Sequence, residues 1–159
     1  ACIAADQGDY TEARVLLEES LMIRRQLGDR GGLALSLNTL ADVVLDEGDH
    51  ASARPLLDEA LAISRELGDQ TSIAYLVEDY AGLAAAEDQP RRALKLAGFA
   101  AGLREAIGAP LPPAEQARVD RMIAPARLAL PATADVAWAE GRGLGLTQAL
   151  DQALADIPQ

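Results

Sequence analysis

The sequence predicts an all-α protein in which antiparallel helix pairs stack into a solenoid. Three observations predict this class: an internal repeat, apolar side chains spaced for helices, and a composition rich in alanine and leucine. Aromatic residues make up only 3% of the chain and apolar residues 50%, so aliphatic side chains have to fill the core. Because alanine and leucine are also the strongest helix formers, composition and spacing favour the same class.

The repeat has a period of 40 residues. The dipeptide Gly8-Asp9 returns as Gly48-Asp49, and alignment of residues 8–30 with residues 48–70 gives 13 identities in 23 positions. A weaker third copy follows at the same offset. A fixed period of this length is the sequence signature of a stacked repeat protein.

Each repeat is predicted to contain two helices. Apolar residues three and four apart form a stripe along the first helix: Leu33, Leu37, Leu40, Ala41 and Val44. A broader stripe follows along the second helix: Ala53, Leu56, Leu57, Ala60, Leu61, Ile63 and Leu67. Between the two, Asp49 is expected to be the N-cap of the second helix. Gly68 is expected to follow that helix in the left-handed conformation that favours glycine.

This pattern resembles the tetratricopeptide repeat. A unit that starts at Ala34 places Ala41, Ala53 and Ala60 where that family has small residues, and Leu57 where it has a bulky one. The period of 40 residues is longer than the family's usual unit of about 34. The resemblance implies a right-handed α-α superhelix that binds other proteins.

The array is predicted to occupy residues 1–109. It divides into a partial repeat (1–29) and two further repeats (30–69 and 70–109). In the register of the resemblance Ala1 falls inside a unit, so we expect the chain to begin within a helix of a longer protein.

Residues 110–159 are predicted to form a C-terminal helical cap. Consecutive prolines in the segment Ala109–Pro113 cannot continue a helix and indicate a stiff linker. The expected capping helices lie near residues 113–129, 132–142 and 146–157. Pro125 is expected to kink or split the first of them. A polar cap of this kind protects the end of a solenoid.

The tail resembles a more specific group of proteins. Residues Leu103–Pro113 and Trp138–Arg142 are similar to the C-terminal region of bacterial STAND/LuxR-type or AfsR-type multidomain regulators. This resemblance implies the end of a bacterial signalling ATPase or transcriptional regulator. The motifs of an ATPase or DNA-binding domain do not occur in this chain.

The net charge of −11 disfavours two classes of partner. Nucleic acids and anionic membranes are bound mainly through lysine and arginine, so we expect neither a direct nucleic-acid contact nor a membrane contact. With a single cysteine the chain has no internal disulfide, which fits the cytoplasm.

The sequence favours a protein without catalytic activity. The one histidine, His50, is expected in a turn, and a catalytic triad or a metal cluster needs further partners. The glycines lack the Lys-Ser/Thr of a phosphate-binding loop. We therefore expect neither a cofactor nor a metal.

The resemblance implies a concave groove lined by the first helix of each repeat. Its candidate binding residues are Asn38, Asp42, Asp46, Tyr75, Glu78 and Asp79. The family's groove positions hold no lysine or arginine here, so an acidic lining would suit a basic or neutral-polar partner. That partner would be a protein, a peptide or the ATPase module of the same chain.

Four alternatives stay open at this point. The groove residues could be ordinary solvated side chains, or the groove could bind a small-molecule inducer, for which Tyr75 is the aromatic handle. The chain could instead be a stand-alone scaffold or spacer that forms a homo-oligomer. The fourth alternative, an enzyme that assists phosphoryl chemistry, lacks a histidine or metal cluster.

Overall fold

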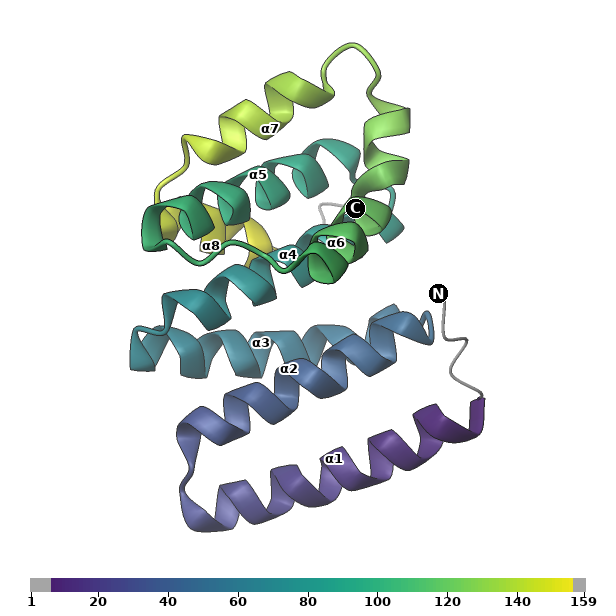
Figure 1. The fold of residues 1–159 in the computed structure, drawn as a ribbon, viewed down its shortest axis with the longest axis vertical. Coiled ribbons are helices and arrows are strands. Elements are labelled where there is room, and N and C mark those ends of the chain that lie inside the picture. Colours follow the sequence, from purple (N-terminus) through teal and green to yellow (C-terminus); the bar gives the residue numbers. More distant parts are fainter. Residues whose placement is uncertain (1–6, 156–159) are drawn as a thin grey trace. The chain divides into compact units, whose positions relative to one another are not determined.

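The computed structural model describes residues 7–155, and their regular elements are helices (Figure 1). The helices are α1 (Gln7–Leu27), α2 (Arg30–Asp46), α3 (His50–Leu67), α4 (Gln70–Ala86), α5 (Pro90–Ile107), α6 (Pro113–Ala129), α7 (Ala134–Arg142) and α8 (Leu146–Leu154). The predicted all-α, tetratricopeptide-like class is confirmed. The first six residues of the expected partial repeat and the last four of the expected cap lie outside the described residues.

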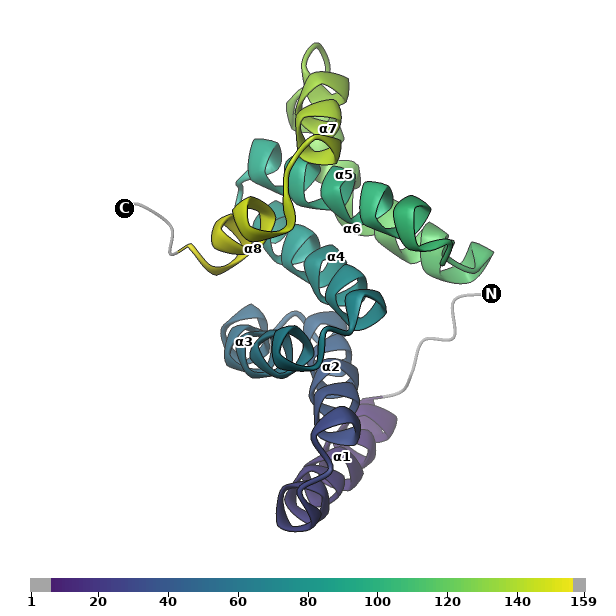
Figure 2. The same cartoon turned by 90° about the vertical axis from the view of Figure 1, so that its left-hand side faces the viewer.

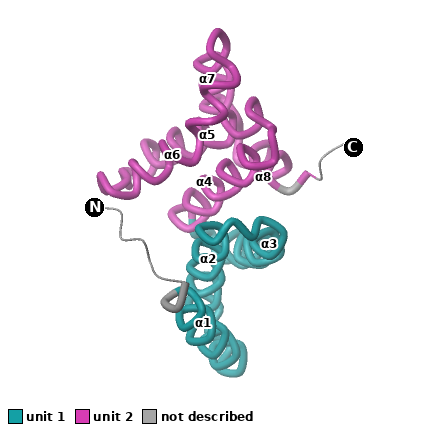
Figure 3. Tube along the Cα trace, turned by 90° about the vertical axis from the view of Figure 1, so that its right-hand side faces the viewer, with its two compact units in different colours: residues 1–69 teal, residues 70–159 magenta. Residues whose placement is uncertain are grey.

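The chain divides into two compact units (Figure 3). Unit 1 is Ala1–Asp69, and unit 2 is Gln70–Gln159. The division coincides with the expected end of the second repeat. The expected third repeat shares unit 2 with the expected cap, so these two segments fold against each other.

Unit 1 contains α1, α2 and α3, which follow one another through short turns. Asp49 is the N-cap of α3, as predicted: its carboxylate accepts a hydrogen bond from the backbone N–H of Ser52 at 3.1 Å. The pKa of the Asp49 carboxyl is lowered, first by a hydrogen bond with the Ser52 side chain and then by this backbone hydrogen bond. Gly68 ends α3 with φ +67°, which confirms the predicted left-handed residue.

Alanines allow the two helices of each pair to approach closely. The predicted small positions of both complete repeats are fully buried: Ala41, Ala53, Ala60, Ala81, Ala93 and Ala100 are each 0% exposed. Leu57, at the predicted bulky position, is also 0% exposed. A larger side chain at the alanine positions would overpack the contact, at about 1–3 kcal/mol.

The turns between helices keep one backbone conformation through the repeats. Gly48 follows α2 with φ +80°, and the residue 40 positions later, Asp88, keeps a positive φ of 59° after α4. A left-handed conformation is strained for most residues and unstrained for glycine, although aspartate tolerates it better than most. The third repeat therefore forms the same turn with aspartate in place of glycine.

Unit 2 is built around the pair formed by α4 and α5. Helix α7 packs against the side of α5 away from α4, while α6 and α8 lie on opposite sides of the pair (Figure 2). The three expected capping helices thus surround the last repeat. Their observed bounds differ by three residues or fewer from those predicted, except that the predicted end of α8 lies outside the described residues.

Glycines bring the backbones of α5 and α7 into direct contact. A Cβ atom at Gly98 of α5 would lie 2.2 Å from the carbonyl oxygen of Trp138 in α7. A Cβ atom at Gly141 of α7 would lie 1.9 Å from the carbonyl oxygen of Lys95 in α5. Only glycine therefore fits at either position without a shift of the backbone.

Pro125 does not split α6. The helix runs from Pro113 to Ala129 with Pro125 inside it, so of the two expected outcomes, a kink or a split, the split is ruled out. Proline removes one backbone hydrogen bond from a helix. Packing offsets that loss, because Ile123 and Ala126 on either side of it are buried.

Asp88→Gly is expected to stabilise the protein by about 0.5–1 kcal/mol, because glycine relieves the strain of a positive φ. At the equivalent turn, Gly48→Ala adds a side chain to a residue with a positive φ, and it is expected to destabilise the protein by a similar amount. Chemical denaturation followed by circular dichroism measures both. Equal stability of the Asp88→Gly variant and the parent would contradict the strain at this turn.

Gly141→Ala is expected to lower the free energy of unfolding by more than about 2 kcal/mol, because the new methyl group meets the backbone of α5. Gly143→Ala is the matched control. Its Cβ would lie 3.5 Å from the nearest atom, the carbonyl oxygen of Glu140, which is an ordinary contact. Thermal denaturation should show a loss for the first variant and little change or a gain for the second.

Candidate functional site

The six predicted groove residues fall on two helices in different units. Asn38, Asp42 and Asp46 lie on α2 in unit 1, and the other three, Tyr75, Glu78 and Asp79, lie on α4 in unit 2. We call Leu35, Asn38, Asp42 and Asp46 the α2 face. We call Tyr75, Glu78, Asp79 and Gly82 the α4 face.

The α2 face is open and polar around one apolar side chain. Its members are three and four residues apart, so they share one side of the helix. Leu35 is 63% exposed, Asn38 and Asp42 are half-buried, and Asp46 is exposed. A large apolar side chain beside two carboxylates resembles the mixed chemistry of a protein-binding surface.

One polar atom of the α2 face is buried without a partner. The side-chain oxygen Oδ1 of Asn38 accepts no hydrogen bond from the residues that the structure describes. Leaving such an atom unsatisfied costs about 1–3 kcal/mol.

Asp46 opposes the dipole of its own helix. It is the last residue of α2, and the last turn of α2 has no basic residue. The C-terminus of a helix carries partial negative charge, so a carboxylate there is unfavourable. A residue that breaks a local rule in this way is often retained for function.

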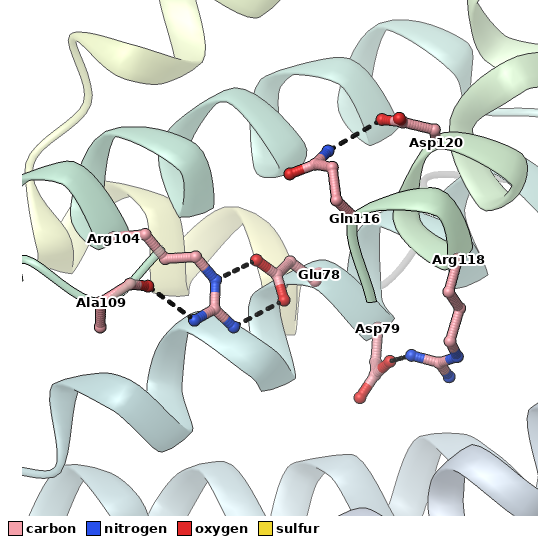
Figure 4. Close-up of polar contacts among 7 residues, drawn as sticks. All are labelled: Glu78, Asp79, Arg104, Ala109, Gln116, Arg118 and Asp120. Carbon is pink, nitrogen blue, oxygen red and sulfur yellow. Dashed lines mark hydrogen bonds and ion pairs between the residues drawn. The ribbon is translucent and has the colours of Figure 1, made fainter. Parts of the chain in front are cut away.

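The α4 face differs, because its carboxylates are buried. Glu78 is 4% exposed and accepts two hydrogen bonds from Arg104 of α5 (Figure 4): from Nε at 2.6 Å and from Nη2 at 2.9 Å. Arg104 is itself 5% exposed. This bidentate geometry is the strongest form of an arginine–carboxylate contact.

Arg104 also contacts two other groups. Its guanidinium lies 4.1 Å from the centre of the Tyr75 ring, which is within the range of a cation–π contact. Its Nη1 donates a hydrogen bond to the carbonyl oxygen of Ala109 at 3.2 Å. The arginine therefore ties α4, α5 and the start of the linker together.

Burial and pairing have opposite effects on the ionisation of Glu78 and Arg104. Burial, the largest cause, raises the pKa of the Glu78 carboxyl above its ordinary value, while the hydrogen bonds and charge of Arg104 lower it. Burial lowers the pKa of Arg104, but contacts with Glu78 and Tyr75 raise it above its ordinary value. Removing either partner would leave the other charge buried and unpaired.

Helix α6 covers the rest of the α4 face. Asp79 is 1% exposed and forms an ion pair with Arg118 of α6 at 3.2 Å (Figure 4). A Cβ atom at Gly82 would lie 2.8 Å from the sulfur of Met122, also in α6. The expectation that Glu78 and Asp79 present negative charge to a partner is therefore corrected, because arginines of the same chain neutralise both.

Sequence reasoning missed Arg104 and Arg118. A signal for Arg104 was present, because it stands on the apolar stripe of α5, four residues after Ala100. Glu78 likewise interrupts an apolar helix, and buried charges of opposite sign require each other. Arg118 has no comparable signal, because only the fold places α6 on α4.

The small-molecule alternative finds little support at Tyr75, whose ring is covered by Arg104. A nearby pocket of about 410 Å³ is lined by Ala101, Arg104, Glu105, Gly108, Pro110, Leu111 and Gln116. Arg104, the cation in its lining, already donates hydrogen bonds to Glu78 and Ala109. We assign no ligand to this pocket.

Within residues 7–155, no helix is long and apolar enough to cross a membrane. In the same part of the chain, histidine, cysteine and carboxylate side chains form no group of three or more that could hold a metal ion.

Residues 1–66 match the family model of the tetratricopeptide repeat. The match supports a tetratricopeptide repeat in this segment, which contains the partial repeat and nearly all of the second one. Tetratricopeptide repeats are non-catalytic scaffolds that generally mediate protein–protein interaction. No curated protein and no solved structure matches the chain significantly.

The buried pair predicts a strongly non-additive double variant. Glu78→Leu and Arg104→Met are each expected to lower the free energy of unfolding by about 3–5 kcal/mol, because each leaves one buried charge unpaired. The double variant has no such charge and is expected to be about as stable as the parent. Urea denaturation of the four proteins measures the coupling.

The exposed pair between Arg142 and Glu105 is the control for this experiment. Glu105→Leu is expected to change stability by less than about 1 kcal/mol, because surface ion pairs contribute little. Losses that simply add in the Glu78→Leu/Arg104→Met variant would show that the two buried groups act independently.

Proposed function

We propose that the chain is a non-catalytic protein-interaction module and that its α2 face binds a basic or neutral-polar protein or peptide. The observation that carries this proposal is the 63% exposed side chain of Leu35, which lies on the same side of α2 as the carboxylates of Asp42 and Asp46. Both carboxylates have oxygen atoms that accept hydrogen bonds. Lysine and arginine supply the matching donors.

The apolar part of the α2 face supports a protein partner over a simple cation. Leu35 exposes 63% of its surface beside the acceptors. A partner that covers Leu35 with an apolar side chain and places basic groups over Asp42 and Asp46 would match both properties. This combination of an apolar centre and charged surroundings is typical of protein interfaces.

We further propose that the module belongs to a bacterial signalling ATPase or transcriptional regulator of the cytoplasm. The resemblance of Leu103–Pro113 and Trp138–Arg142 to the ends of such proteins supports this context. The ATPase module of the same protein is then one partner that the α2 face could contact. Sequencing the gene upstream of the codon for Ala1 tests this context directly, since a phosphate-binding loop would be encoded there.

The variant Asp42→Lys/Asp46→Lys tests the α2 face. The probe is a fluorescent helical peptide with two lysines four residues apart beside a leucine, measured by fluorescence anisotropy. The parent chain is expected to bind this peptide more tightly than a copy with glutamates in place of the lysines. The double variant is expected to bind the lysine peptide at least about tenfold more weakly, because attraction becomes repulsion.

Glu12→Lys/Glu18→Lys is the matched control, because it changes the net charge equally through two exposed residues of α1. It is expected to bind like the parent. If the parent does not prefer the lysine peptide, or if both double variants lose binding equally, the α2 face is not the binding site.

A further inference from the structure

The α4 face already carries a helix, which is the chain's own α6. Two side chains of α6, four residues apart, contact it: Arg118 pairs with Asp79 at 3.2 Å, and Met122 packs where Gly82 has no side chain. The charge of Glu115, three residues before Arg118, acts on Glu78. One side of α6 therefore lies along the α4 face.

The α4 face matches such a helix in both charge and shape. Asp79 is 1% exposed, and its carboxylate pairs with the cation of Arg118 in the helix above it. Gly82 leaves room for a flexible apolar side chain, and a Cβ atom there would lie only 2.8 Å from the sulfur of Met122. The same repeat position in α2 holds Asp42, which lacks this space. The two faces thus suit different partners.

Helix α6 buries fewer of its residues than α4, which lies beneath it. Only three of its residues are buried, Val119, Ile123 and Ala126, whereas α4 buries ten. Leu128 of α6 is 81% exposed. Few buried apolar contacts mean a low free energy of local opening.

The helices next to α6 also contact one another directly. Segments outside the helices join α6 to α5 and to α7. The backbone contact at Gly98 and Gly141 holds α7 on α5 independently of α6. The contact between α5 and α7 therefore does not depend on α6.

We propose that the α4 face is a binding site for a partner helix that carries an arginine four residues before a methionine or leucine. Helix α6 occupies this site within the chain until such a helix displaces it. The arginine pairs with Asp79, and the apolar residue fills the space above Gly82. This inference goes beyond the proposed function of the α2 face, because it concerns different residues and a different partner.

The test uses the full chain and a fluorescent peptide with the sequence of residues 113–129. Arg118→Asp in the chain repels α6 from Asp79 and opens the site. The Arg118→Asp chain is expected to bind the peptide at least about tenfold more tightly than the parent chain, in which α6 competes. A peptide that carries the same Arg118→Asp change is expected to lose this binding.

Two further chains locate the site. Arg121→Asp makes the same change of charge at an exposed residue of α6 and is expected to bind the peptide as weakly as the parent. The double variant Arg118→Asp/Gly82→Met fills the space above residue 82 and is expected to bind no peptide. Binding that survives in this double variant would place the peptide elsewhere and overturn the proposal.

Amide hydrogen exchange separates displacement from unfolding. In the Arg118→Asp chain, α6 is expected to exchange faster while α5 and α7 stay protected. If α5 and α7 also lose protection, α6 is a fixed part of the core and the proposal fails. Unchanged protection of α6 without a gain in peptide binding overturns it as well.

Discussion

Close contact between helix backbones is the constraint on which the rest of the structure depends. Alanines such as Ala53 and Ala93, each 0% exposed, bring paired helices together without space for larger side chains. Between α5 and α7 the same role falls to Gly98 and Gly141, where even a methyl group would meet backbone atoms. A core packed this densely holds few polar groups, and each polar group that it holds needs a partner.

The ion pair of Glu78 and Arg104 follows from that constraint. Both side chains lie where α4 and α5 pack, and each is 5% exposed or less. Their charges are stabilised by each other and by the neighbouring groups of Tyr75, Ala109 and Arg118. Separating the two groups would leave a charge buried without its partner, so the packing of α5 on α4 has to keep them together.

The second and third repeats share one architecture, but the chemistry of their first helices differs. In the second repeat, α2 exposes Leu35 and the carboxylate of Asp46. In the third, arginines of the chain cover the carboxylates of α4, so part of the net negative charge is neutralised internally. An acidic sequence therefore gives an acidic surface only where the fold leaves carboxylates without arginines. This difference is the physical basis for assigning the two faces to different partners.

The sequence by itself determined the helices, the turns and the small positions, because these depend on residues close together in the chain. The cap at Asp49 and the left-handed glycine at Gly68 are examples, and both were predicted. Only the tertiary structure decided which charges meet. Asp79 and Arg118 are 39 residues apart and belong to helices whose packing has no local signal. Whether a carboxylate faces solvent, as Asp46 does, or an arginine, as Glu78 and Asp79 do, depends on such distant contacts, which no local pattern in the sequence reveals.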